Sequence, residues 1–150
     1  MTHSRFSFGG PEAPRGGLER ANLAGESRRL FTATGDERLL PLGWMAWSPD
    51  ASEIALISAT LSNSGGPEWA LRLIDATDGA SLARYGLPSA TMAGWPAYTA
   101  GFDKVRWSPN GRAVLISWGN AIVVDVASGK VEQVAATQVL ADWAPDGDAV

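Results

Sequence analysis

The chain contains no cysteine and only one histidine, His3, among its 150 residues. The absence of cysteine excludes disulfide bonds, thiolate zinc sites and cysteine nucleophiles. It does not identify the redox compartment, because secreted proteins can also lack cysteine. His3 lies in an N-terminal segment rich in glycine, proline, serine and arginine, which favours a terminal residue over a metal ligand or general base. With this single imidazole, a Ser-His-Asp triad cannot be assembled from a folded site.

The sequence also has no excess of basic residues and no long apolar run. Residues 41–150 carry six Lys and Arg residues against eleven Asp and Glu residues, a net charge of −5. Nucleic-acid binding usually needs a basic surface, so this balance argues against it. No apolar run approaches the roughly 18 residues of a membrane span, and no secretory signal is visible. We expect a cytoplasmic location if Met1 is the true start.

Sequence motifs for catalysis are missing as well. There is neither a Gly-x-Ser-x-Gly elbow nor a phosphate-binding loop, although a pair of carboxylates for glycoside cleavage stays formally possible. Asp50, Asp75 and Asp146 occur in turn sequences, which predicts side chains bonded to nearby backbone amides. Asp142, Asp146 and Asp148 are closely spaced but lack the ligand spacing of a calcium loop. We expect no catalytic, cofactor-binding or metal-binding residues.

The sequence does contain a short motif that occurs three times, each time between apolar stretches. Recurrence indicates an architecture built from copies of one supersecondary unit. In each copy proline presets a tight turn, and the residue after it, Asp or Asn, tolerates the third turn position. The tryptophan occupies the same point in every copy, which predicts a core residue. The copies are residues 47–50 (Trp-Ser-Pro-Asp), 107–110 (Trp-Ser-Pro-Asn) and 143–146 (Trp-Ala-Pro-Asp).

Short β-type runs separated by turn residues fill the region around these motifs. The apolar runs at 114–116 and 122–124 are continuous where a half-solvated sheet would alternate, so both faces of that sheet must be covered. Blades of a β-propeller meet this requirement because each sheet lies between two others. One unit predicts strands at 104–107, 113–118, 121–126 and 130–135, and an earlier copy with a longer middle hairpin predicts strands at 44–47, 54–60, 69–74 and 80–85.

The ends of the chain predict incomplete units. Residues 1–28 have no helical or alternating apolar period and are expected to form a flexible or disordered arm, leaving residues 29–150 as an incomplete β-propeller domain. Residues 30–40 predict the third and fourth strands of one further unit. Val150 follows Trp143 at the spacing found in the other copies and is expected to begin a strand.

These repeats resemble those of TolB-like β-propellers, a WD-repeat-like class. The resemblance is carried by the three Trp-x-Pro-Asp/Asn motifs and by the Asp-x-x-x-Gly turns at 75–79 and 125–129, and it covers about residues 29–150. The first copy departs from the pattern with Ala51 in place of glycine, and the second with Asn110 in place of aspartate. The resemblance implies a propeller of typically six or seven blades. Such propellers occur in periplasmic transport-associated proteins, in the N-terminal domains of prolyl-oligopeptidase-like enzymes, and in many bacterial sensor or surface proteins.

The expected fold is therefore all-β, a partial β-propeller with about two whole four-stranded blades and two partial ones. Such a chain cannot close a ring, so we expect a fragment of a longer protein, or assembly with further blades or with itself. The expected function is a non-enzymatic interaction module that binds a protein partner through inserted loops at 61–68 and 87–101. Trp95 and Tyr98, in the longer loop, are the expected partner contacts.

Two other functions are compatible with the sequence. One is the substrate-gating propeller domain of a prolyl-oligopeptidase-like serine hydrolase whose catalytic domain is absent from this chain. The other is a carbohydrate-binding or lyase propeller, in which tryptophan side chains would stack on sugars. By resemblance, a periplasmic or extracytoplasmic location is also compatible.

Overall fold

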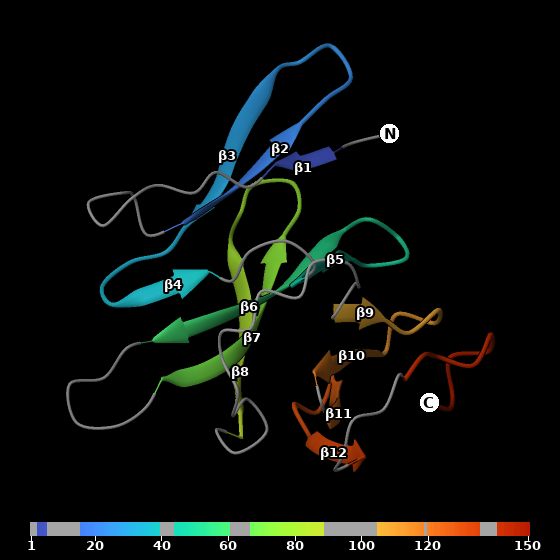
Figure 1. Cartoon of the computed structure of the whole chain (residues 1–150). Helices are drawn as coiled ribbons and strands as arrows, with labels where there is room; N and C mark the ends of the chain where they lie inside the picture. The colour runs from blue at the N-terminus through green and yellow to red at the C-terminus, as the bar shows by residue number, and fades with distance from the viewer. Residues whose placement is uncertain are drawn as a thin grey trace.

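The computed structural model contains antiparallel β-sheets (Figure 1). All regular elements in the described part of the chain are strands, which agrees with the expected all-β class. The described residues are 3–5, 16–39, 44–60, 67–88, 105–118, 120–135 and 141–150.

The first sheet has three strands: β1 (His3–Arg5), β2 (Gly17–Ala21) and β3 (Ser27–Thr32). β2 lies in the middle and pairs antiparallel with both neighbours. Two of the three strands therefore lie within the residues that the sequence predicts to be an arm.

The difference from the predicted arm at residues 1–28 has a local physical reason. β2 is held in the core by one apolar side chain, Leu18, which is fully buried. A single anchor produces no periodic pattern in the sequence. The turn after β2 is held by the Asn22 side chain, whose Oδ1 accepts the backbone N–H groups of Ala24 and Glu26 at 3.0 Å. This arrangement is an Asx-type turn, which forms independently of any apolar period.

The second sheet has the order β4-β6-β7-β8, with β5 also paired to β6. Its main strands agree with the predicted ones to within about two residues at each end. The strands are β4 (Glu37–Leu39), β5 (Met45–Trp47), β6 (Glu53–Thr60), β7 (Glu68–Asp75) and β8 (Ser81–Leu87).

The position of β4 corrects the predicted hairpin within residues 30–40. β3 and β4 do not pair with each other, because β3 pairs with β2 and β4 pairs with the far end of β6. β4 lies opposite residues 58–60 and β5 opposite residues 54–56, so two short strands share one edge of β6. The paired residues of β4 and β6 are about 20 positions apart in the sequence. Their pairing therefore depends on how the whole sheet assembles and not on local sequence signals.

A buried ion pair fixes β4 against the second sheet. Glu37 is only 5% exposed, and its carboxylate accepts from the Arg72 guanidinium in β7 through two N–H groups, one of them at 3.0 Å. The Arg72 guanidinium also lies over the ring of Phe31 in β3, 5.5 Å from the centroid. A bidentate pair of this kind gives directional bonding. It therefore links the first and second sheets as well as β4 and β7.

The third sheet has the order β12-β11-β10-β9 and is antiparallel throughout. Its four strands match those predicted at 104–107, 113–118, 121–126 and 130–135 to within one residue. They are β9 (Val105–Trp107), β10 (Ala113–Trp118), β11 (Asn120–Asp125) and β12 (Val131–Ala135).

The second sheet is covered on both faces. The covering predicted from the apolar runs at 114–116 and 122–124 concerns the third sheet, of which one face joins a core cluster. Successive side chains along β6 point to opposite faces and join different core clusters. Burying both faces removes apolar surface from water on each side and orders three sheets relative to one another. The cluster shared with the first sheet includes Leu18, Leu30, Ile54, Leu56 and Ile74, and the cluster shared with the third sheet includes Ala55, Ile57, Leu71, Val114 and Ile116.

The segment 141–150 forms a turn, but no strand is assigned within it. The strand expected to start at Val150 is therefore not observed. The side chain of Val150 is 48% exposed. Extended backbone becomes a strand only when a neighbour supplies hydrogen bonds, and no described segment pairs with these residues.

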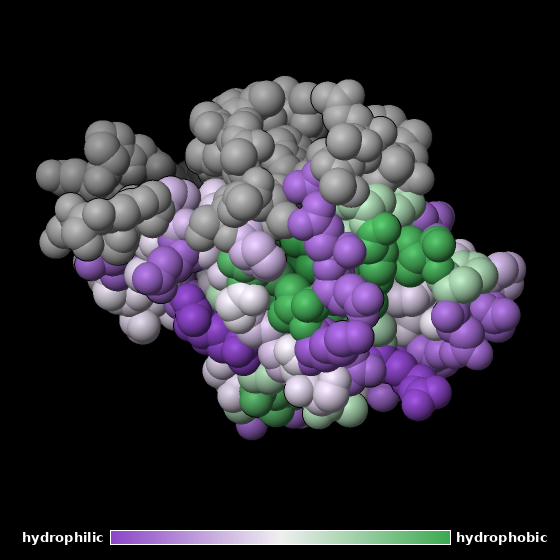
Figure 2. All heavy atoms as spheres, turned by 90° about the horizontal axis from the view of Figure 1, so that it is seen from below, coloured by the Kyte–Doolittle hydropathy of each residue, from purple (hydrophilic) through white to green (hydrophobic). Residues whose placement is uncertain are grey.

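The surface retains some apolar area. Figure 2 shows hydrophobic residues on the face seen from below, in areas separated by a row of hydrophilic residues. Two of the exposed large apolar side chains lie on the outer strands, Leu82 in β8 at 50% exposure and Val134 in β12 at 47%. None of the elements in the described part of the chain is an apolar helix of membrane-spanning length.

Candidate ligand pocket between two motif turns

All three copies of the tryptophan motif form the same turn. In each, the second motif residue donates its N–H to a residue five positions later and accepts the N–H of a residue three positions later. The distances are 2.9 and 2.9 Å at Ser48, 2.8 and 2.9 Å at Ser108, and 2.8 and 2.9 Å at Ala144. The predicted tight turns are therefore confirmed.

The residue after proline supports each turn with its side chain. Asp50 Oδ1 accepts from the Ser48 hydroxyl at 2.6 Å and from the Ser52 N–H at 3.1 Å. Asn110 Oδ1 accepts from the Ser108 hydroxyl at 2.8 Å, and Asp146 Oδ1 accepts the N–H of residue 148 at 3.0 Å. The interpretation of these side chains as turn formers is confirmed.

The position after that side chain has a left-handed backbone in all three turns. Gly111 has φ of 72° and Gly147 has φ of 78°, whereas Ala51 has φ of 59°. Glycine adopts this conformation without steric cost, but alanine does not. The first turn therefore carries backbone strain that the other two avoid.

Exchanging these residues is expected to change stability in opposite directions. Ala51→Gly should raise the free energy of unfolding by about 0.5 kcal/mol, since relief of strain outweighs the added backbone entropy of glycine. Gly111→Ala should lower it by about 1 kcal/mol. A Cβ at 111 would approach only the Pro49 Cδ, at 3.9 Å, so the effect is conformational. Urea denaturation at unchanged m-value measures both. Changes of the same sign would contradict this account.

The motif tryptophans connect consecutive units through a repeated hydrogen bond. The indole N–H of Trp107 donates to the carbonyl of Ala46, and that of Trp143 donates to the carbonyl of Arg106, both at 3.1 Å. In each case the acceptor directly precedes the tryptophan of the preceding copy. The predicted core position is confirmed for Trp107, which is 9% exposed. Trp47 and Trp143 are only partly buried.

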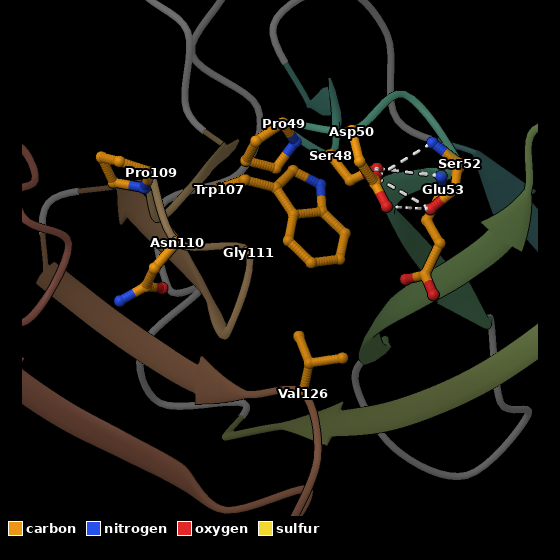
Figure 3. Close-up of a pocket in the computed structure, with 10 residues that line it drawn as sticks. All are labelled: Ser48, Pro49, Asp50, Ser52, Glu53, Trp107, Pro109, Asn110, Gly111 and Val126. Carbon is orange, nitrogen blue, oxygen red and sulfur yellow. Dashed lines mark hydrogen bonds between the residues drawn. The ribbon is translucent and has the colours of Figure 1, made fainter.

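A pocket of about 240 Å³ lies between the first two motif turns (Figure 3). The strands that lead into these turns, β5 and β9, are in contact, which brings the turns together. Glu53 and Pro49 line the pocket from the second sheet, and Trp107 and Val126 line it from the third. Figure 3 shows the Trp107 indole and the Glu53 carboxylate projecting into the same space.

Glu53 is the electrostatically unusual residue of the pocket. Burial raises the pKa of its carboxyl, and the negative charges of Asp50 and Asp75 raise this pKa further. Its Oε2 atom is buried and has no hydrogen-bond partner within the described structure. Buried acceptors without a donor are uncommon, because the lost hydration is not replaced. The pocket thus contains an unused acceptor.

The other ionisable groups at the pocket are already engaged. Hydrogen bonds from the Ser48 hydroxyl and from Ser52 lower the pKa of Asp50 to about 2. The Tyr85 hydroxyl donates to the carbonyl of Val126 at 2.7 Å. Burial raises the pKa of Tyr85, and the charges of Glu53 and Asp125 add to the effect. Asp50 is therefore ionised and accepts hydrogen bonds from Ser48 and Ser52, whereas Glu53 Oε2 accepts none.

The pocket combines a buried acceptor, an aromatic ring and apolar walls, which suits a donor that carries positive charge. Within the described residues, no group of three or more His, Cys, Asp or Glu side chains is placed to hold a metal ion. Near the third turn, Asp142 pairs with Arg106, and Asp148 accepts from the Asn110 side chain at 3.1 Å. These contacts fit the interpretation of Asp142 and Asp148 as turn and surface carboxylates.

The sequence analysis singled out different residues. Trp95 and Tyr98 lie outside the described residues, as do positions 61–66 and 89–101 of the two expected loops. The pocket itself was missed. A signal was available, because Glu53 occupies the repeat position that holds alanine in the other two copies, at 113 and 149. The same turn forms with alanine at this position, so the turn does not require the charged side chain of Glu53.

Comparison with known proteins supports the fold. No protein-family model matches the chain, and no curated protein matches its sequence. The structure is similar to that of TolB from Acinetobacter baumannii, with a TM-score of 0.59 and 17% identity over 97% of this chain and 34% of TolB. A putative 6-phosphogluconolactonase from Bacteroides fragilis gives a TM-score of 0.39 and 14% identity over 79% of this chain and 32% of that protein.

The chain spans about a third of the length of both solved structures. At 17% identity the likeness to TolB concerns the fold alone. The fold is thus all-β and similar to the TolB β-propeller.

Proposed function

We propose that this chain is a partial TolB-like β-propeller that acts as a non-enzymatic interaction module and binds a protein partner. In this proposal the third sheet is a four-stranded blade, and β5–β8 of the five-stranded second sheet form another, with β4 added at the edge of β6. The first sheet and the segment 141–150 belong to incomplete blades. Further blades come from the rest of a longer protein or from another copy of the chain.

The two-sided burial of the second sheet is the observation that carries the proposal. Core clusters on its two faces fix β6, β7 and β8 relative to the neighbouring sheets. The segments 61–66 and 89–104 connect β6 to β7 and β8 to β9, so both begin and end on fixed strands. Variable loops on a rigid scaffold are a common arrangement for binding surfaces. The loops are therefore the proposed recognition elements.

Exposed apolar side chains also favour a partner. Leu82 and Val134 are about half exposed, at 50% and 47%, on the outer strands of the second and third sheets. Figure 2 shows hydrophobic residues on the face seen from below. Apolar side chains exposed on a folded protein are surfaces that a partner can cover.

Trp95 is the proposed anchor of the partner, with Tyr98 beside it in the same segment. Aromatic side chains supply a large share of the binding energy at protein interfaces. With a photoreactive phenylalanine analogue at position 95 in cells that make the protein, we expect a discrete cross-linked polypeptide, identified by mass spectrometry. The same analogue at position 23 serves as the control, because Leu23 is 76% exposed in the β2–β3 turn.

The purified partner then permits a quantitative test. Trp95→Ala should weaken binding at least about tenfold in calorimetric titration, whereas Leu23→Ala should leave affinity unchanged. Equal affinities for both variants, or no specific cross-link from position 95, would contradict the proposed role of this loop. Unchanged circular dichroism of both variants ensures that the comparison concerns binding.

A further inference from the structure

We propose that the pocket between the first two motif turns binds the guanidinium group of an arginine side chain presented by a polypeptide. This inference rests on the interaction function proposed above and names a chemical feature of its partner. It concerns the pocket lined by Glu53 and Trp107, and not the segment that contains Trp95.

The unused acceptor is the first reason. Glu53 Oε2 is buried without a hydrogen-bond partner, and Figure 3 shows this carboxylate directed into the pocket. The neighbouring Asp50 cannot supply the missing donor, because its carboxyl is ionised and carries no proton. Glu53 lines the pocket, so rotation of its carboxylate would turn Oε2 toward a charged donor bound there and allow a short, charge-assisted bond.

The walls of the pocket are the second reason. The Trp107 indole is held in place by its bond to the Ala46 carbonyl at 3.1 Å, so its ring forms a fixed wall. A guanidinium is planar, stacks on aromatic rings and bonds carboxylates, and is more weakly hydrated than an ammonium group. The rings of Pro49 and Pro109 provide apolar surface for the aliphatic stem. Arginine therefore fits this lining better than lysine does.

The size and composition of the pocket argue against two other occupants. Its volume of about 240 Å³ is below the roughly 300–1,000 Å³ of pockets that enclose small-molecule ligands. It suits one side chain of a longer polypeptide. Calcium and magnesium need about six or more oxygen ligands, whereas Glu53 offers a single carboxylate with an unused oxygen.

The electrostatic surroundings favour a cation. Negative charges of Asp50 and Asp75 act on Glu53, and Asp125 acts with Glu53 on Tyr85. Two cations act at the edge of this neighbourhood, Arg112 and Lys130, and both interact with Asp125. A bound guanidinium favours the ionised form of Glu53, which burial and its neighbours disfavour in the free protein. Binding should therefore weaken as the pH falls through the pKa of Glu53.

Nuclear magnetic resonance of the full chain provides the test. The probe is the peptide acetyl-Ala-Ala-Arg-Ala-Ala-amide, and the matched control contains citrulline, which replaces the guanidinium by a neutral urea of similar shape. We expect saturable shifts of the Trp107 indole N–H signal with the arginine peptide, and at least about tenfold weaker binding of the citrulline peptide. Ethylguanidinium, as a free small cation, should bind less tightly than the arginine peptide.

A variant pair locates the site. Glu53→Gln should weaken binding of the arginine peptide at least about tenfold, because it removes the negative charge and keeps the shape. Glu26→Gln, in the exposed turn between β2 and β3, should bind like the original chain. The wild-type comparison of arginine with citrulline remains decisive even if Glu53→Gln fails to fold.

Three results would overturn the inference: no saturable shift at Trp107, equal binding of the arginine and citrulline peptides, or unchanged binding by a folded Glu53→Gln variant. If ethylguanidinium bound as tightly as the arginine peptide, the claim that the guanidinium belongs to a polypeptide would be wrong. None of these results affects cross-linking at position 95. Failure of the pocket and failure of the proposed function are therefore distinguishable.

Discussion

Trp107→Ala is expected to lower the free energy of unfolding by about 3–5 kcal/mol, which is the usual range for removal of a buried tryptophan. Trp107 is 9% exposed and belongs to the core cluster between the second and third sheets. Its loss would leave a cavity there and would also leave the Ala46 carbonyl without its indole donor. Since small domains have only about 5–15 kcal/mol of stability, this change comes close to unfolding the chain.

Urea denaturation followed by far-ultraviolet circular dichroism measures this effect without relying on tryptophan fluorescence, to which seven residues contribute. Trp107→Phe is the matched control, because it keeps an aromatic ring but not the N–H donor. We expect it to be destabilised by less than the alanine variant. A decrease of less than about 1 kcal/mol in the free energy of unfolding of Trp107→Ala would be typical of a surface substitution. It would contradict the role of Trp107 between the sheets.

Trp107 also forms a wall of the proposed arginine pocket. A variant at this position would therefore change stability and binding together. Glu53 separates the two properties, because its Oε2 takes no part in any hydrogen bond of the described structure. This is why the binding test depends on Glu53 and the stability test on Trp107.

Gly79→Ala is expected to be the other strongly destabilising substitution, at about 3 kcal/mol or more. Gly79 lies in the turn between β7 and β8 with φ of 84°. A Cβ atom at this position would lie 1.8 Å from the Leu30 carbonyl oxygen and 2.5 Å from its carbonyl carbon. Both atoms belong to the backbone of β3, so a whole strand must move to relieve the collision.

Gly129→Ala is a closely matched control for this prediction. Gly129 occupies the equivalent turn of the third sheet with φ of 72°, but its added Cβ would meet the Tyr85 ring at 3.2 Å. A side chain can shift where a backbone carbonyl cannot. We expect Gly129→Ala to cost about 1 kcal/mol, mainly from the backbone conformation. Denaturant midpoints compare the two variants, and equal costs would show that β3 does not pack against this turn.

The outer turns show how much of the fold local sequence can predict. Asp75 and Asp125 each accept backbone N–H groups through Oδ1, at 2.6 Å from Thr77 and 2.7 Å from Ser128. The Asp75 side chain was expected to form a turn, and Asp125 begins the same Asp-x-x-x-Gly pattern. Asx-type bonding joins residues two or three positions apart, so the chain itself brings donor and acceptor together. The strands between such turns were located for the same reason.

The candidate site shows the opposite situation. Glu53 is six residues after Trp47 and 54 residues before Trp107. The environment of Glu53 depends on how the second and third sheets pack together. The residues that pack there decide whether its carboxylate finds a hydrogen-bond donor. The turn role of Asp50 follows from the local sequence, whereas the burial of Glu53 Oε2 without a partner depends on the tertiary structure.

By itself, the sequence determined the repeated turns, the strands between them and the apolar character of the strands at 114–116 and 122–124. These properties follow from proline, glycine and aspartate acting on neighbouring backbone and from continuous apolar runs. Only the tertiary structure decided that β4 pairs with β6, that β2 joins a sheet, and that Glu53 meets Trp107 across an interface. Such pairings join residues far apart in the chain, and the choice among them depends on which surfaces the whole fold buries together.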